Sequence, residues 1–291
     1  MNHQMSTSAE HNRSHYIKKI IAGLFKYVSL VLISFIMLVP VVSCVITALK
    51  TDKEYANTNV MTPPENWLNF DNFIKAFRTA NMGRAFINSL FILLFVLAGS
   101  IMIGAMLAYI LNRFTFRGNN LIRALFLFAA LIPGVAMQVT VFSIMTSLNL
   151  VNTLAGYVIL LLGTDVISIY VFLQFFENIS VSLDESAIVD GASYYTVFFR
   201  ILLPLLKPAI VTCMILKGVS TYNEYYMANL YLHDEELKVM STSLYTFTGP
   251  YGNQYNLICA GVIISLLPAL IVFITCQSKI YNGLTQGAVK G

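Results

Sequence analysis

The chain has few charged residues for its length. Of its 291 residues only 11% are Asp, Glu, Lys or Arg, whereas 57% are hydrophobic. A soluble domain of this size would have about 25% charged residues, so this composition excludes one. The sequence is that of a polytopic membrane protein, most of whose surface faces the lipid bilayer.

Motifs of enzymatic catalysis and of metal binding are also absent. The sequence has no G-x-x-x-x-G-K-[ST] phosphate loop, no H-E-x-x-H pair and no G-x-S-x-G element. The cysteines, Cys44, Cys213, Cys259 and Cys276, lie in apolar runs without a C-x-x-C pair, which favours packing over disulfides or metal ligation. We therefore expect no enzyme, no cofactor and no metal.

Long uncharged runs are abundant, and a helix needs about 20 such residues to cross the hydrocarbon core. The runs of this kind are residues 27–49, 85–112, the two halves of 124–164, 208–232 and part of 239–278. Asn149 and Asn152 form the polar turn that divides the third run. Six membrane-spanning helices are expected.

The Lys and Arg residues predict the orientation. With both termini in the cytoplasm, eleven of the eighteen lie on the inner side, and no basic surface suited to nucleic acid is left. The expected divisions are a cytoplasmic tail (1–26), the first span (27–49), an extracytoplasmic loop with an interfacial helix (50–84), a five-helix core (85–278) and a second cytoplasmic tail (279–291).

A charged segment interrupts the core after residue 181. Ser182 and Glu185 have the spacing of a capping box, which predicts a helix start. Gly191 then permits a turn, and Ser193 restarts a helical stretch. We expect a short helix-turn-helix outside the bilayer that contacts a partner, although an ordinary amphipathic connector would have the same pattern.

The spacing in this segment resembles the EAA loop of ABC importer permeases, E-A-A-x3-G-x9-I-x-L-P. The corresponding residues are Glu185, Ser186, Ala187, Asp190, Gly191, Ala192, Ile201, Leu203 and Pro204. Only Ser186 departs from the pattern, a small residue in place of alanine. The surrounding sequence is similar to the carbohydrate branch, the smaller permease of maltose-type transporters, and the resemblance covers about residues 85–291.

This resemblance implies an all-α integral membrane protein with six transmembrane helices, the type I ABC importer transmembrane domain. Its coupling loop, residues 182–204, would contact a cytoplasmic ATPase, as would Gln286, Gly287 and Lys290 near the carboxyl end. The implied partners are a second, homologous permease, two ATPase subunits and an extracytoplasmic sugar-binding protein. The implied function is ATP-driven carbohydrate import across the cytoplasmic membrane of a bacterium.

Polar residues inside predicted spans are candidates for the substrate path, because they are costly in lipid. Residues 222–226, YNEYY, resemble the W-N-E-F element of sugar permeases. The candidates are Tyr222, Asn223, Glu224, Tyr226 and Asp165. An aromatic belt at the membrane surface would explain the tyrosines equally well, and Asp165 could instead pair with the second permease.

Two other kinds of protein fit the same composition. An ion-coupled secondary transporter or channel would use Asp165 and Glu224 to bind ions. A membrane scaffold would transport nothing. Neither alternative accounts for the spacing of the charged segment.

Overall fold

The structure is a computed structural model that describes the chain except residues 1, 164, 250–251 and 289–291. The chain forms two compact units. Residues 1–76 and 253–263 make up the first, and residues 77–252 and 264–291 make up the second.

The first unit contains the long amino-terminal helix and the start of the carboxy-terminal helix. Its elements are α1 (Asn2–Leu49), α2 (Asp52–Asn57), most of α3 (Asp71–Thr79) and the first residues of α15 (Tyr255–Ala288). One continuous helix, α1, includes residues of both the predicted amino-terminal tail and the predicted first span, and α3 lies where an interfacial helix was predicted. Asn72 is buried and donates to the carbonyls of Ala48 (2.8 Å) and Lys50 (2.7 Å), which attaches α3 to the end of α1.

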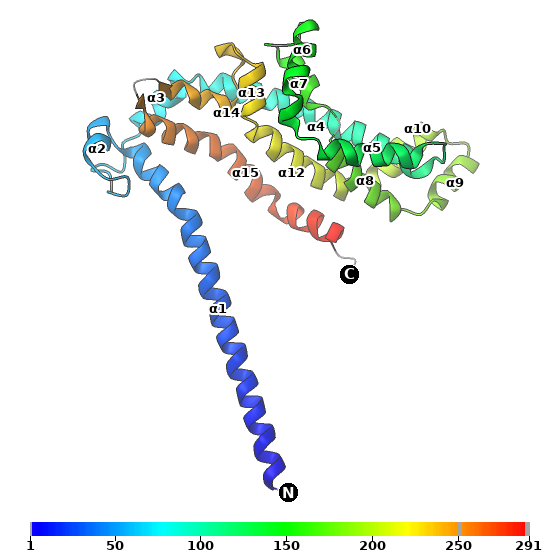
Figure 1. Cartoon of the computed structure of the whole chain (residues 1–291), viewed down its shortest axis with the longest axis horizontal. Helices are drawn as coiled ribbons and strands as arrows, with labels where there is room; N and C mark the ends of the chain where they lie inside the picture. Colours follow the sequence, from blue (N-terminus) through cyan, green and yellow to red (C-terminus); the bar gives the residue numbers. More distant parts are fainter. Residues whose placement is uncertain (1, 164, 250–251, 289–291) are drawn as a thin grey trace. The chain divides into compact units, whose positions relative to one another are not determined.

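The second unit contains most of the helices. These are α4 (Met82–Arg113), α5 (Asn119–Leu131), η1 (Gly134–Met137), α6 (Gln138–Ser147), α7 (Leu154–Leu161), α8 (Val166–Glu177), α9 (Ser182–Val189), α10 (Tyr194–Thr196), η2 (Val197–Leu202), α11 (Leu203–Leu205), α12 (Lys207–Asn223), α13 (Tyr226–Tyr231), η3 (Glu235–Leu237), α14 (Met240–Ser243) and η4 (Leu244–Phe247). The strands β1 (Thr248–Gly249) and β2 (Gly252–Asn253) precede α15. Figure 1 shows α8, α9 and α10 at one end of this unit and α13 and α14 toward the other.

Three stretches are single helices long and apolar enough to cross a membrane: Ile21–Leu49, Met82–Arg113 and Tyr255–Gln277. Three pairs of bent helices pass the same test together, so the described residues hold up to six spans if each pair is one. The helical stretches on either side of Pro133, Asn119–Leu131 and Gly134–Ser147, meet at 92°. Proline lacks the N–H that would continue the helix.

The fifth predicted span, residues 208–232, is wrong at its carboxyl end. Helix α12 stops at Asn223, where Glu224 adopts extended geometry with ψ of 105°. The Glu224 carboxylate accepts the backbone N–H of Met227, in the first turn of α13, at 2.9 Å. Residues 208–232 are therefore divided between two helices.

The core of the second unit lies between α4, α8 and α12. Small residues on α4, including Ala105 and Ala108, are fully buried against Phe172 of α8. Close approach through small side chains is the usual basis of helix packing in lipid, where the hydrophobic effect does not drive association. Cys213 of α12 is buried in the same cluster, which confirms its prediction as a packing residue.

Candidate functional site

The predicted helix-turn-helix is present as α9 and α10. Helix α9 ends at Val189, and Gly191 reverses the chain with φ of +88°, a left-handed conformation that glycine adopts at little cost. Ser193 then begins α10, its hydroxyl accepting the N–H of Thr196 at 3.2 Å. The two short helices and their glycine turn form the first part of the predicted coupling loop, residues 182–204.

The capping box predicted from Ser182 and Glu185 is wrong. Ser182 is already the first helical residue, Val181 precedes it and makes no side-chain cap bond, and the N–H of Ser182 donates to the Ser180 hydroxyl at 3.3 Å. The Ser182 hydroxyl instead lies 2.8 Å from that of Ser180. The acidic residue that fixes the first turn is Asp184, which points inward.

Asp184 is buried and forms an ion pair with Arg113, the last residue of α4. The Arg113 Nε lies 2.6 Å from Asp184 Oδ2, and the two side chains are only 7% and 8% exposed. Arg113 also donates to the carbonyls of Ile179 (2.9 Å) and Phe176 (3.4 Å), which follow and end α8. One guanidinium thus joins α4, the end of α8 and the first turn of α9.

The other face of the coupling loop is exposed. Glu185, Ser186, Asp190 and Gly191 all face solvent, whereas Ala187 and Ala192 are half-buried against the core. Large apolar side chains are exposed beside them: Leu183, Ile188, Val189, Tyr194 and Tyr195. Val189 is 86% and Tyr195 74% exposed, so this face combines apolar and acidic groups.

The last part of the coupling loop, which leads to α12, contains Ile201, Leu203 and Pro204. Ile201 belongs to the π-helical turn η2, Leu203 and Pro204 to the one-turn helix α11. Proline has no N–H to donate, and a π-helical turn is a wider, rarer form than the α-helix. The stretch from Tyr194 to Leu205 meets α12 at an angle of 74°.

The structure describes only some of the carboxy-terminal residues that were predicted to contact the ATPase. Gln286 and Gly287 fall within the last turns of α15, whose backbone extends to Ala288. Lys290 lies outside the described residues.

The candidates for the substrate path make contacts within the protein. The Tyr222 hydroxyl donates to the carbonyl of Ser265 (2.7 Å), and the Asn223 amide donates to the carbonyl of Val219 (3.0 Å). Asp165 caps α8 by accepting the backbone N–H of Ser168 at 3.4 Å, and it also accepts the Ser168 hydroxyl at 2.7 Å. The structure does not gather these residues into one site, and Tyr226 is exposed.

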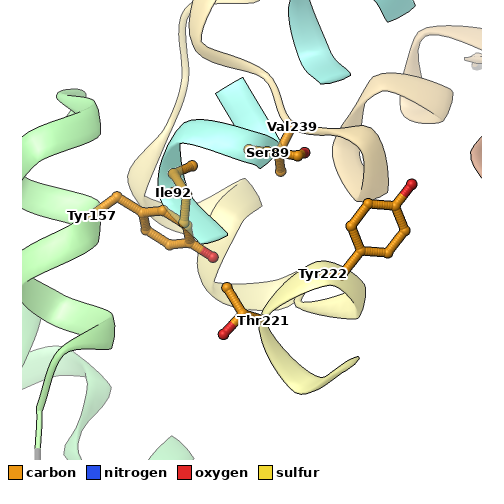
Figure 2. A pocket seen from close by; sticks show the side chains of 6 residues that line it. All are labelled: Ser89, Ile92, Tyr157, Thr221, Tyr222 and Val239. Carbon is orange, nitrogen blue, oxygen red and sulfur yellow. The ribbon is translucent and has the colours of Figure 1, made fainter. Parts of the chain in front are cut away.

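A small cavity of about 10 Å³ is lined by a residue that was not among the candidates predicted from the sequence. Figure 2 shows the hydroxyl of Tyr157, from α7, directed toward Thr221 of α12. Tyr157 is 2% exposed, and its hydroxyl has no hydrogen-bond partner among the described residues. The cavity is lined by Ser89, Ile92, Tyr157, Thr221, Tyr222 and Val239. Its volume suits about one water molecule.

Comparisons with known proteins agree with this arrangement. Residues 100–282 match the family described as binding-protein-dependent transport system inner membrane component. The chain is 30% identical over 261 residues to the arabinooligosaccharides transport system permease protein AraQ of Halalkalibacterium halodurans, covering 89% of this chain and 93% of that protein. It is 29% identical over 247 residues to the melibiose/raffinose/stachyose import permease protein MelC of Bacillus subtilis, covering 84% and 88%.

A solved structure has the same fold. The crystal structure of a bacterial ABC transporter involved in the import of the acidic polysaccharide alginate matches with a TM-score of 0.78 and 20% identity, over 89% of this chain and 96% of that chain. The family match spans more than half of the sequence. The chain therefore belongs to the family of binding-protein-dependent transport system inner membrane components, and it is a permease subunit of an ABC importer.

Proposed function

We propose that the protein forms the membrane path of an ATP-driven carbohydrate importer. One relative described above is named for arabinooligosaccharides and the other for melibiose, raffinose and stachyose, and all of these are carbohydrates with hydroxyl-rich surfaces. ATP hydrolysis would occur in two separate cytoplasmic subunits, and an extracytoplasmic binding protein would deliver the sugar. A second, homologous permease would complete the path.

The observation that supports this proposal most is the exposed face of the coupling loop. Leu183, Val189 and Tyr195 are apolar side chains that a cytoplasmic loop does not expose without a partner. Exposed Glu185 and Asp190 beside them supply charge for specific contacts with a basic partner surface. A cleft in an ATPase subunit is the partner that the EAA spacing implies.

The proposed transport mechanism depends on the geometry of the coupling loop. ATP binding would draw the two ATPase subunits together, and the coupling loop would move with the cleft that holds it. Because α9 is short and packed on its inner face, it would transfer this displacement to the bundle and open the path outward. Hydrolysis and ATPase separation would return the path to the inward-open state.

The decisive experiment changes the exposed loop and measures assembly. Glu185→Lys reverses a charge at the proposed contact, and Gly191→Val strains the turn that shapes it. In membranes that hold the full transporter, both variants are expected to lower ATPase co-purification and sugar uptake. Glu65→Lys is the matched control, since Glu65 is an exposed acid in the predicted extracytoplasmic loop. Normal assembly and uptake in both loop variants would refute the proposal.

A further inference from the structure

The two ends of α9 are attached to the rest of the protein in different ways. Its carboxyl end leads through Gly191, and among the described atoms none lies within 4 Å of where a Gly191 Cβ would be. The chain then passes through the π-helical turn η2 and the 74° bend before α12 begins. The glycine turn, the π-helical turn and the bend interrupt the helix in succession, and Val197, Phe198 and Leu202 of η2 are buried in the core.

The amino end of α9 is held rigidly. Asp184, in its first turn, is paired at 2.6 Å with Arg113, and both side chains are buried. Burial excludes water from the pair, so its attraction is screened less than that of a surface pair. A displacement of α9 must therefore break this pair or move the groups to which Arg113 is bound.

Those groups belong to two of the principal helices of the core. Arg113 is the last residue of α4, so its backbone moves with that helix. Its guanidinium donates to the carbonyls of Phe176 and Ile179 and lies over the Phe176 ring at 5.7 Å. The positive charge thus sits at the negative end of α8. Lysine could not make this set of contacts, because it lacks the planar fork of donors.

Stability alone does not explain the ion pair between Arg113 and Asp184. Asp184 Oδ1 is buried, and within the described chain it has no hydrogen-bond partner. A buried ion pair that leaves one oxygen unsatisfied recovers only part of its desolvation cost. The ion pair does provide a direct connection between α9 and the ends of α4 and α8.

We propose that Arg113 is the positioning residue through which the coupling loop moves the membrane helices. Displacement of α9 passes through Asp184 to Arg113, and from there to α4 and α8, separately from the chain connection through Pro204 to α12. This inference rests on the proposed function, because it requires an ATPase that moves the loop. It predicts that breaking the pair uncouples ATP hydrolysis from transport without releasing the ATPase.

The test measures sugar transported per ATP hydrolysed by the complete transporter reconstituted in lipid vesicles. Asp184→Asn removes the charge at constant size, and Arg113→Lys keeps the charge but loses the fork. Both are expected to assemble with the ATPase and to lower this ratio at least about fivefold. Glu236→Gln is the matched control, because it removes the exposed Arg84–Glu236 pair, 3.0 Å apart, and should leave the ratio unchanged.

A second variant covers the case in which a lone buried charge prevents folding. Arg113→Met combined with Asp184→Leu leaves no buried charge unpaired, and such replacements are often neutral for stability. The assembled double variant is also expected to have a low ratio. A purely structural pair would instead lower the melting temperature and leave the ratio of the assembled complex intact.

The outcomes separate this inference from the proposed function. An unchanged ratio in the assembled pair variants, together with a loss of transport in Gly191→Val, overturns the role of Arg113 and leaves the coupling loop in place. An unchanged ratio in the assembled pair variants, together with normal assembly and uptake in Glu185→Lys and Gly191→Val, overturns both. A low ratio in the assembled pair variants, with a normal ratio in Glu236→Gln, supports the role of Arg113.

Discussion

The guanidinium of Arg113 lies 2.6 Å from the carboxylate of Asp184, 71 residues along the chain, and both side chains are buried. This ion pair joins the carboxyl end of α4 to the first turn of the helix that we propose to contact the ATPase. It gives the coupling loop a fixed attachment at one end, and Gly191 gives it freedom at the other.

Removing one partner of this pair is expected to destabilise the protein. Asp184→Ala leaves the Arg113 charge buried, which costs about 3–5 kcal/mol in proteins generally. Glu236→Ala, in the exposed pair with Arg84, should cost at most about 1 kcal/mol. Thermal unfolding of the purified subunit in detergent compares the two, and equal melting temperatures would contradict the burial of Asp184.

The first turn of α9 shows what the sequence could and could not predict. The spacing from Glu185 to Pro204 predicted the loop, its turn at Gly191 and its exposure. It assigned the helix start to a capping box, because Ser182 and Glu185 fit the local rule. A local pattern cannot show that Arg113, 71 residues earlier, attracts Asp184 inward and fixes the turn from outside the segment.

The membrane-spanning helices could also be predicted only in part from the sequence. Hydropathy predicted the runs that can cross the bilayer. It could not place the end of α12, because that end depends on the Glu224 carboxylate accepting the N–H of Met227. The sequence did not identify Tyr157 as a candidate, because this residue lies in an apolar run. What distinguishes it is that its buried hydroxyl has no hydrogen-bond partner among the described residues.

Tyr157→Phe is expected to leave stability unchanged or to raise it. The hydroxyl is buried without a partner among the described groups, so the present cost of its desolvation, about 1–3 kcal/mol, disappears with it. Tyr231→Phe is the comparison, because the Tyr231 hydroxyl donates to Gln138 at 3.4 Å. Melting temperatures of both variants test this, and a marked loss for Tyr157→Phe would show that the hydroxyl is bonded in the native protein.

Substitutions of Gly191 should differ according to backbone preference. Its φ of +88° is unfavourable for residues with a Cβ, although space is not limiting there. Asn tolerates left-handed geometry better than Val does, so Gly191→Asn should retain more sugar uptake than Gly191→Val. Uptake assays at matched expression measure the difference. Equal uptake in the two variants would mean that the turn geometry is not required.

Glu54 should make the loop after α1 sensitive to acid. The N–H groups of Glu65 and Thr51 donate to its carboxylate, both at 2.7 Å, and they hold the pKa of Glu54 below its usual range. A lowered pKa in the folded state stabilises the loop above the usual carboxyl pKa, and this contribution is lost as pH falls through the lowered value. Amide hydrogen exchange at residues 51–65, followed from about pH 6 to pH 3, should show this loss. Glu54→Gln should abolish it, and an identical pH response in that variant would exclude Glu54 as the cause.

The central claim is that transport by this permease is driven by ATP. The direct measurement is uptake of a panel of labelled oligosaccharides into vesicles that contain the complete transporter and its binding protein. We predict uptake with ATP inside the vesicles, and none when a non-hydrolysable analogue replaces ATP, with or without proton and sodium gradients. Uptake driven by an ion gradient in the absence of ATP hydrolysis would contradict the account and favour a secondary transporter.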